Sequence, residues 1–216
     1  MHRQGPYRHT RFLRQAARNR EYEFVPHRKH TAGEPPHSTT DMHSAPSSYF
    51  ALFNLEPRFA LAEVELDGAY RALAARIHPD RFVDADPATQ RAALELSANA
   101  NEAYRTLKKP ALRAQHLLGL HGVVANDRSA AMSPAFLMEQ MEWREALGEA
   151  KSSSDLGALQ QLTAMVRQRI RAIHAQLATQ LDEQQDHPAA AASVNQLMFV
   201  EKLAADIDDA CLQLEE

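Results

Sequence analysis

Three consecutive residues, His78, Pro79 and Asp80, have the clearest chemical potential in this 216-residue sequence. An imidazole and a carboxylate two positions apart suggest acid–base chemistry, but such a pair needs a third group to orient it and a place for substrate. No third group is evident, and the chain has neither a glycine-rich phosphate loop nor a zinc-protease His-Glu signature. We therefore expect no catalytic residue and no enzymatic activity of its own.

Two amphipathic patterns flank this tripeptide. Pro79 disfavours helical geometry in the residue before it and lacks the amide hydrogen that a continuing helix needs. Asp86-Pro87 is typical of an N-cap followed by a first-turn proline. Apolar residues recur every three or four positions on each side, which predicts two antiparallel helices joined at the tripeptide. These residues are Leu66, Tyr70, Leu73 and Ile77 before it and Ala93, Leu96, Ala100, Tyr104 and Leu107 after it.

This arrangement resembles the J-domain, whose His-Pro-Asp signature joins two long helices and stimulates ATP hydrolysis by DnaK-type chaperones. The apolar run at 49–53 and the pair Arg81-Phe82 also fit that family. Longer runs at 100–107, 110–122 and 135–142 are similar to the HscB family, the J-protein co-chaperones of iron–sulfur cluster assembly. The similarity extends from about Ser47 to the C-terminus.

The resemblance implies two partners, an HscA/DnaK-type ATPase and the iron–sulfur scaffold IscU, which the protein would deliver to that ATPase. It implies that His78, Pro79 and Asp80 contact the chaperone. Three arginines, Arg71, Arg76 and Arg81, would supply positive charge toward an acidic chaperone surface. For Arg71 and Arg76 the alternative is ordinary solvated charge on a helix.

Composition and charge agree with an all-α protein. Alanine and leucine are abundant and only seven glycines occur, which favours helices. The segments 1–46, 47–121 and 122–216 carry net charges of +4, 0 and −8, and the acidic last segment argues against a nucleic-acid partner. No apolar stretch approaches the roughly 20 residues of a membrane span. A single cysteine, Cys211, excludes an intramolecular disulfide and a cysteine-rich metal or cluster site, so we expect no cofactor.

We predict a disordered basic extension over 1–46, a J-domain over 47–121, a linker over 122–132 and a scaffold-binding domain over 133–216. The extension has three explanations: a mitochondrial transit peptide, an upstream translation artefact with the true start at Met42, or a regulatory or metal-binding tail. Some eukaryotic members of the family that this sequence resembles carry an N-terminal zinc motif of paired cysteines. The absence of that motif here favours a bacterial, cytoplasmic protein. The mitochondrial matrix is the alternative.

The C-terminal domain is predicted as a bundle of three antiparallel helices. The first begins after the cap Ser133 and runs to about Ala150. Ser153 or Ser154 is predicted to cap the second, from Asp155 to about Glu183, and a third begins at Pro188.

The first of these helices has more apolar surface than one buried face needs. Phe136, Trp143 and Leu147 share one sector of the helical wheel. A second group of apolar residues on this helix is bordered by carboxylates. This group either binds a partner or is covered by the J-domain or by the third helix, and helical geometry alone does not decide between the two. The HscB resemblance favours scaffold binding here and adds Phe199 from the last helix. The predicted scaffold-binding residues are Leu137, Met138, Met141, Glu142, Glu145, Glu149 and Phe199.

Two rival functions differ in their partners. A more general J-protein would carry another client, and a structural adaptor would keep the helical hairpin without activating an ATPase. Client binding without ATPase stimulation would distinguish the adaptor.

Overall fold

The computed structural model describes residues 48–125 and 132–215. The predicted N-terminal extension and most of the predicted linker lie outside these residues. Within them the regular structure is entirely helical, which confirms the predicted all-α class. Two compact units are present: one comprises residues 48–55 and 64–104, and the other comprises 56–63 and the described residues from 105 onward.

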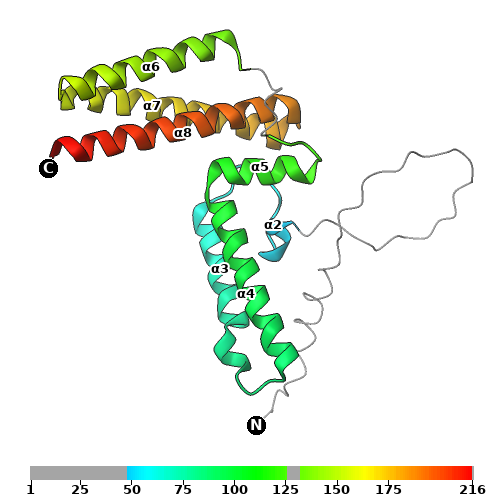
Figure 1. Cartoon of the computed structure of the whole chain (residues 1–216). Helices are drawn as coiled ribbons and strands as arrows, with labels where there is room; N and C mark the ends of the chain where they lie inside the picture. The colour runs from blue at the N-terminus through cyan, green and yellow to red at the C-terminus, as the bar shows by residue number, and fades with distance from the viewer. Residues whose placement is uncertain (1–47, 126–131, 216) are drawn as a thin grey trace, which may run out of the picture. The chain divides into compact units, whose positions relative to one another are not determined.

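The first unit contains the predicted helical hairpin (Figure 1). It includes α2 (Tyr49–Leu52), most of α3 (Glu63–Ile77), the short 3-10 helix η2 (Pro79–Phe82) and most of α4 (Pro87–Lys108). Asp86 caps α4 as predicted, because its Oδ1 accepts hydrogen bonds from the backbone amides of Ala88 and Thr89 at 3.0 Å each.

Aromatic contacts hold the hairpin together. The rings of Tyr70 on α3 and Tyr104 on α4 stack with centroids 4.2 Å apart. Each hydroxyl donates to the opposite helix, from Tyr70 to Asn101 at 2.7 Å and from Tyr104 to Asp67 at 2.8 Å. Phenol rings that pack and also satisfy their hydroxyl groups fix the register of the two helices.

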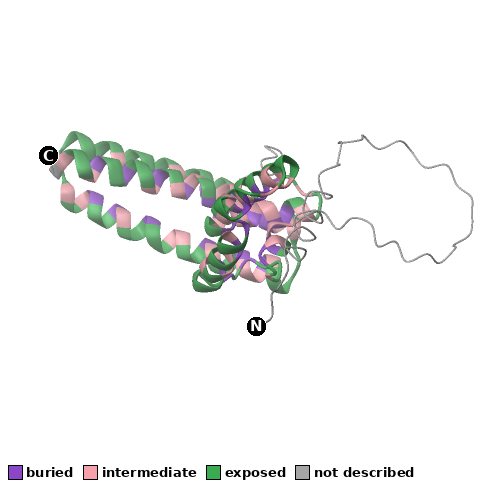
Figure 2. Ribbon diagram, turned by 90° about the horizontal axis from the view of Figure 1, so that it is seen from below, coloured by how far each residue is buried: buried purple, intermediate pink, exposed green. Residues whose placement is uncertain are grey.

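The second unit contains α5 (Pro110–Leu120), α6 (Pro134–Ser152), α7 (Leu156–Ala178), the π-helical turn η3 (Thr179–Glu183) and α8 (His187–Glu215). The last three long helices form the predicted bundle, and α5 packs on α8. Figure 2 shows buried positions recurring along these helices between exposed ones. The largest fully buried side chains of α7 and α8 are Leu159, Leu162, Ile173, Leu177, Leu197 and Ile207.

Asp155 is the N-cap of α7, so the predicted cap at Ser153 or Ser154 is wrong. Its Oδ1 accepts from the amide of Ala158 at 2.9 Å. Ser153 instead ends α6, donating its hydroxyl to the carbonyl of Glu149 at 2.7 Å. Ser154 adopts a left-handed conformation with φ of 52°, which reverses the chain and leaves Asp155 in the extended geometry that an N-cap requires.

The division into units counts α5 and segment 56–63 with the bundle. The predicted J-domain boundary at residue 121 stays a prediction about function. Among the described residues, no helix is both long and apolar enough to span a membrane.

Candidate functional site

His78, Pro79 and Asp80 form the turn that follows α3. His78 leaves helical geometry, with φ of −55° and ψ of 130°, and Pro79 opens η2. The His78 Nδ1 accepts from the Asp80 amide at 3.4 Å and lies 3.5 Å from the Asp80 carboxylate. The side chains of His78 and Asp80 are 60% and 84% exposed. This turn therefore presents an imidazole and a carboxylate to solvent, where a partner can reach both.

Arg81 links this turn to α3. Its guanidinium donates to the carbonyl of Ala75 at 3.1 Å, in the last turn of α3, where carbonyls lack helical partners. Phe82 is buried and anchors the other end of η2. Arg76 lies in the last turn of α3 near the signature, whereas Arg71 precedes it by five residues, about 7.5 Å along the helix axis. All three predicted arginines are exposed.

The second candidate surface lies on α6. Leu137, Met138 and Met141 are 47%, 64% and 70% exposed, whereas Phe136 and Trp143 are buried. This confirms that α6 has a buried and an exposed apolar side. Glu142, Glu145 and Glu149 are exposed on the same helix. The result is an apolar surface with carboxylates beside it.

Phe199 connects this region to α8. Its ring packs edge-on against Phe136, with centroids 6.0 Å apart, and it is half-buried. The guanidinium of Arg144 lies 5.0 Å from the centre of the ring, within cation–π range. Arg144 was not predicted, because the site on this helix was expected to contain apolar and acidic residues only. Its position three residues after Met141 was the available signal.

A third arrangement anchors segment 56–63 within the second unit. The carboxylate of Asp182, on η3, accepts from the backbone amides of Phe59 at 2.6 Å and Ala60 at 2.8 Å. The Phe59 ring lies edge-on to His174 at 6.1 Å and 5.2 Å from the Arg113 guanidinium. Two charge-assisted hydrogen bonds and a buried ring hold this segment.

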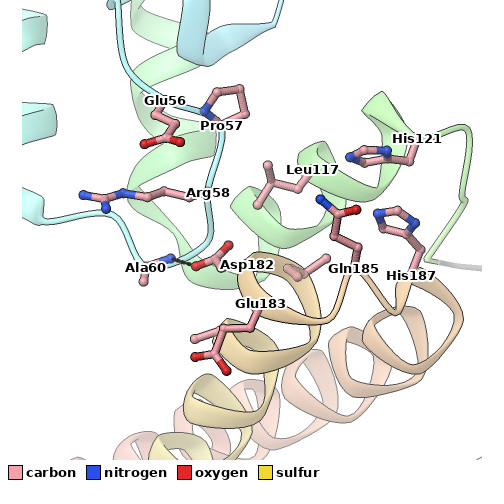
Figure 3. Close-up of a pocket in the computed structure, with 12 residues that line it drawn as sticks. Glu56, Pro57, Arg58, Ala60, Leu117, His121, Asp182, Glu183, Gln185 and His187 are labelled. Carbon is pink, nitrogen blue, oxygen red and sulfur yellow. Dashed lines mark hydrogen bonds between the residues drawn. The ribbon is translucent and has the colours of Figure 1, made fainter.

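A cavity of about 520 Å³ lies beside this anchor (Figure 3). The rings of His121 and His187 stack on one another in its wall, with centroids 4.0 Å apart. Glu56 and Arg58 line it from segment 56–63. Among the described residues, no three histidine, cysteine or acidic side chains are grouped to hold a metal ion.

Removing the Asp182 carboxylate is expected to destabilise the second unit. We predict that Asp182→Ala lowers the free energy of unfolding by about 2 kcal/mol, because two amides lose an ionised acceptor. Urea titration of the full chain measures this. Asp208→Ala is the matched control, since Asp208 makes only a 3.9 Å surface ion pair with Arg167 and should cost less than about 1 kcal/mol. Equal losses would contradict the anchoring role.

Acid is expected to weaken the same region. Burial, and then the charge of Arg113, lower the pKa of His174, and burial lowers the pKa of His116. The folded protein thus binds these protons less readily than the unfolded chain, so stability is full above the unfolded pKa of about 6.5 and falls as pH drops below it.

The His174 contribution can be isolated with His174→Phe, which keeps an aromatic ring against Phe59. The His174 Nε2 is buried without a hydrogen-bond partner among the described residues, so phenylalanine strands no polar group. We expect this variant to lose less stability than the wild type between pH 7.5 and 5.5 in urea titrations. Burial raises the pKa of Glu201, and the charge of Lys109 acts in the opposite direction. Glu201 is present in both the wild type and the variant, so it does not contribute to the difference between them. An equal loss would exclude His174 as a source of acid sensitivity.

Comparison with known proteins identifies the family. A model described as the HSCB C-terminal oligomerisation domain matches residues 132–208. The co-chaperone protein HscB homolog of Azoarcus sp. (strain BH72) is 47% identical over 168 residues, covering 77% of this chain and 95% of that protein. The homolog of Burkholderia multivorans is 46% identical over 175 residues, covering 81% and 99%.

Solved structures agree. Chaperone HscB from Vibrio cholerae has a TM-score of 0.69 at 38% identity, covering 77% of this chain and 99% of that chain. Human co-chaperone protein HscB has a TM-score of 0.67 at 24% identity, covering 86% and 93%, and supports the fold. The helical hairpin of the first unit is thus a J-domain hairpin, and the predicted resemblance is confirmed. This chain belongs to the HscB family of co-chaperones.

Proposed function

We propose that this protein stimulates ATP hydrolysis by an HscA/DnaK-type chaperone and delivers the iron–sulfur scaffold IscU to it. The observation that carries the proposal is the exposed His78-Pro79-Asp80 turn, held between α3 and α4 in a member of a co-chaperone family. The solvent-facing Asp80 carboxylate can pair with a cationic group of the chaperone, and an otherwise acidic chaperone surface would attract the arginines around the turn. Arg76 and Arg81 add positive charge beside it, and Arg71 extends this charge along α3.

The scaffold would bind the exposed side of α6. Leu137, Met138 and Met141 supply adaptable apolar contact, and Glu142, Glu145 and Glu149 supply charge that steers a basic partner. Phe199 contributes its ring from α8, and the Arg144 guanidinium holds that ring in place. The cluster would remain on the scaffold, so the co-chaperone itself needs no cofactor.

We further propose the bacterial cytoplasm as the place of action, because relatives at 46–47% identity come from bacteria. The net charge of −8 over residues 122–216 suits a protein partner rather than a nucleic acid, and we propose no membrane partner.

Single-turnover ATP hydrolysis by the chaperone, with and without this protein and with and without IscU, tests the proposal. We expect the protein to accelerate hydrolysis and IscU to increase the acceleration further. Acceleration indifferent to IscU would mean that the client is another protein. IscU binding without acceleration would favour a structural adaptor, and absence of both would overturn the proposal.

A further inference from the structure

The signature turn, which ends in η2, is joined to α4 by four residues that form no helix. Residues 83–86 follow η2, which ends at Phe82, and precede α4, which begins at Pro87. Val83 is 67% exposed, so its side chain does not fix this stretch. The amide of Ala85 donates to the carbonyl of Phe82 at 3.0 Å, which links residue 85 back to the turn.

Gln90 ties this stretch to α4. The amide nitrogen of its side chain donates to the carbonyls of Val83 at 2.7 Å and Ala85 at 3.0 Å. A primary amide has two N–H donors, so both bonds form at once. Gln90 itself is half-buried, and its backbone amide donates to Asp86 at 3.0 Å. One side chain in the first turns of α4 thus holds two carbonyls outside the helix.

The signature turn is therefore attached to both helices of the hairpin. Arg81 bonds to the last turn of α3 through Ala75, and Gln90 bonds residues 83 and 85 to α4. Binding surfaces gain affinity when neighbouring contacts hold them in the bound geometry before the partner arrives. Loss of one attachment leaves the turn in that geometry for only part of the time.

We propose that Gln90 is a positioning residue for the His78-Pro79-Asp80 turn, acting through Val83 and Ala85 rather than by touching the chaperone. This rests on the proposed ATPase stimulation. If the turn holds its binding geometry for only a fraction of the time, the apparent affinity for the chaperone falls by that fraction. The ATPase stimulation at saturating co-chaperone does not change. Gln90 thus sets the co-chaperone concentration that gives half-maximal ATPase stimulation. The maximal stimulation does not depend on Gln90.

The test compares four full-length proteins: wild type, Gln90→Glu, Gln90→Lys and Gln160→Glu. Glutamate keeps the shape but has no donor and directs a carboxylate at two carbonyls. Lysine restores donors at the same position. Gln160→Glu is the matched control, because Gln160 is exposed on α7 in the other unit. Amide hydrogen exchange over residues 78–86 and ATPase stimulation as a function of co-chaperone concentration are measured for each.

For Gln90→Glu we expect about tenfold faster exchange in 78–86 and about a tenfold higher concentration for half-maximal stimulation, with the same plateau, from the loss of two hydrogen bonds. Gln90→Lys should restore most of the slow exchange and most of the low half-maximal concentration. Gln160→Glu should match wild type in both measurements. Weaker stimulation with unchanged exchange would overturn the proposal, because Gln90 would then contact the chaperone directly. Faster exchange with unchanged stimulation would overturn it equally.

The two proposals fail separately. If the wild type stimulates no ATPase, the proposed function fails, and hydrogen exchange alone decides the role of Gln90. In that case faster exchange in Gln90→Glu supports positioning of the turn, and unchanged exchange overturns it.

Discussion

His78→Gln is expected to reduce the maximal stimulation of chaperone ATP hydrolysis, measured at saturating co-chaperone, by at least about tenfold. The imidazole is exposed, so the chaperone can bury it. A contact that forms only in the hydrolysing state of the chaperone lowers the saturated rate when it is lost, and about 1.4 kcal/mol there corresponds to a tenfold lower plateau. Glutamine retains a polar side chain but loses the planar ring and its fixed bond to the Asp80 amide. Single-turnover hydrolysis measured to saturation provides the plateau.

The fold should survive this change. His78 is exposed and its side chain caps only the four-residue η2, so its replacement should cost no more than about 1 kcal/mol of stability. His121→Gln makes the same chemical change at another exposed histidine and should stimulate like wild type. A normal plateau in His78→Gln would remove the signature turn from the mechanism.

The combined change Leu137→Ser, Met138→Ser and Met141→Ser is expected to weaken scaffold binding at least about a hundredfold. Burial of one leucine or methionine side chain contributes about 1.5–3 kcal/mol, and three at the centre of one interface exceed the roughly 2.7 kcal/mol that a hundredfold change requires. Titration calorimetry with IscU measures the affinity. Stimulation of the chaperone in the absence of IscU should remain.

Met165→Ser controls for the loss of an exposed methionine elsewhere in the same unit, since Met165 is exposed on α7. It should bind IscU like wild type. Neutralising Glu142, Glu145 and Glu149 to glutamine should mainly slow association and reduce its salt dependence. Unchanged affinity in the triple serine variant would place the client on another surface.

Local patterns in the sequence predicted most of the helices. Asp86-Pro87 and Ser133-Pro134 correctly marked the starts of α4 and α6, because capping depends on residues within one turn. The apolar period also separated buried Phe136 and Trp143 from exposed Met138 and Met141. On α8, Ala210 is buried whereas the next residue, Cys211, is only half-buried. A periodic pattern identifies a stripe but does not fix its centre.

Contacts between distant residues were not predictable in this way. Asp182 binds amides 122 and 123 positions away, and nothing near Asp182 in the sequence indicates an acceptor for Phe59. The roles of Arg144 and Gln90 depend on where a ring or a carbonyl lies after folding. Whether the predicted residues on α3, η2, α6 and α8 bind their partners stays a prediction for the ATPase and calorimetry experiments to decide.

The π-helical turn has a consequence for chain length. In η3 the amide of Gln184 donates to the carbonyl of Thr179, five residues back, at 2.9 Å, so this turn holds one residue more than an α-helical turn. A π-turn accommodates its extra residue without adding the rotation of about 100° that one more α-helical residue would bring. Deleting one residue would close the turn to α-helical geometry and move the residues within it, among them Asp182, whose carboxylate accepts from the amides of Phe59 and Ala60. The turn should therefore tolerate substitution of its exposed Glu183 side chain but not the loss of a single residue.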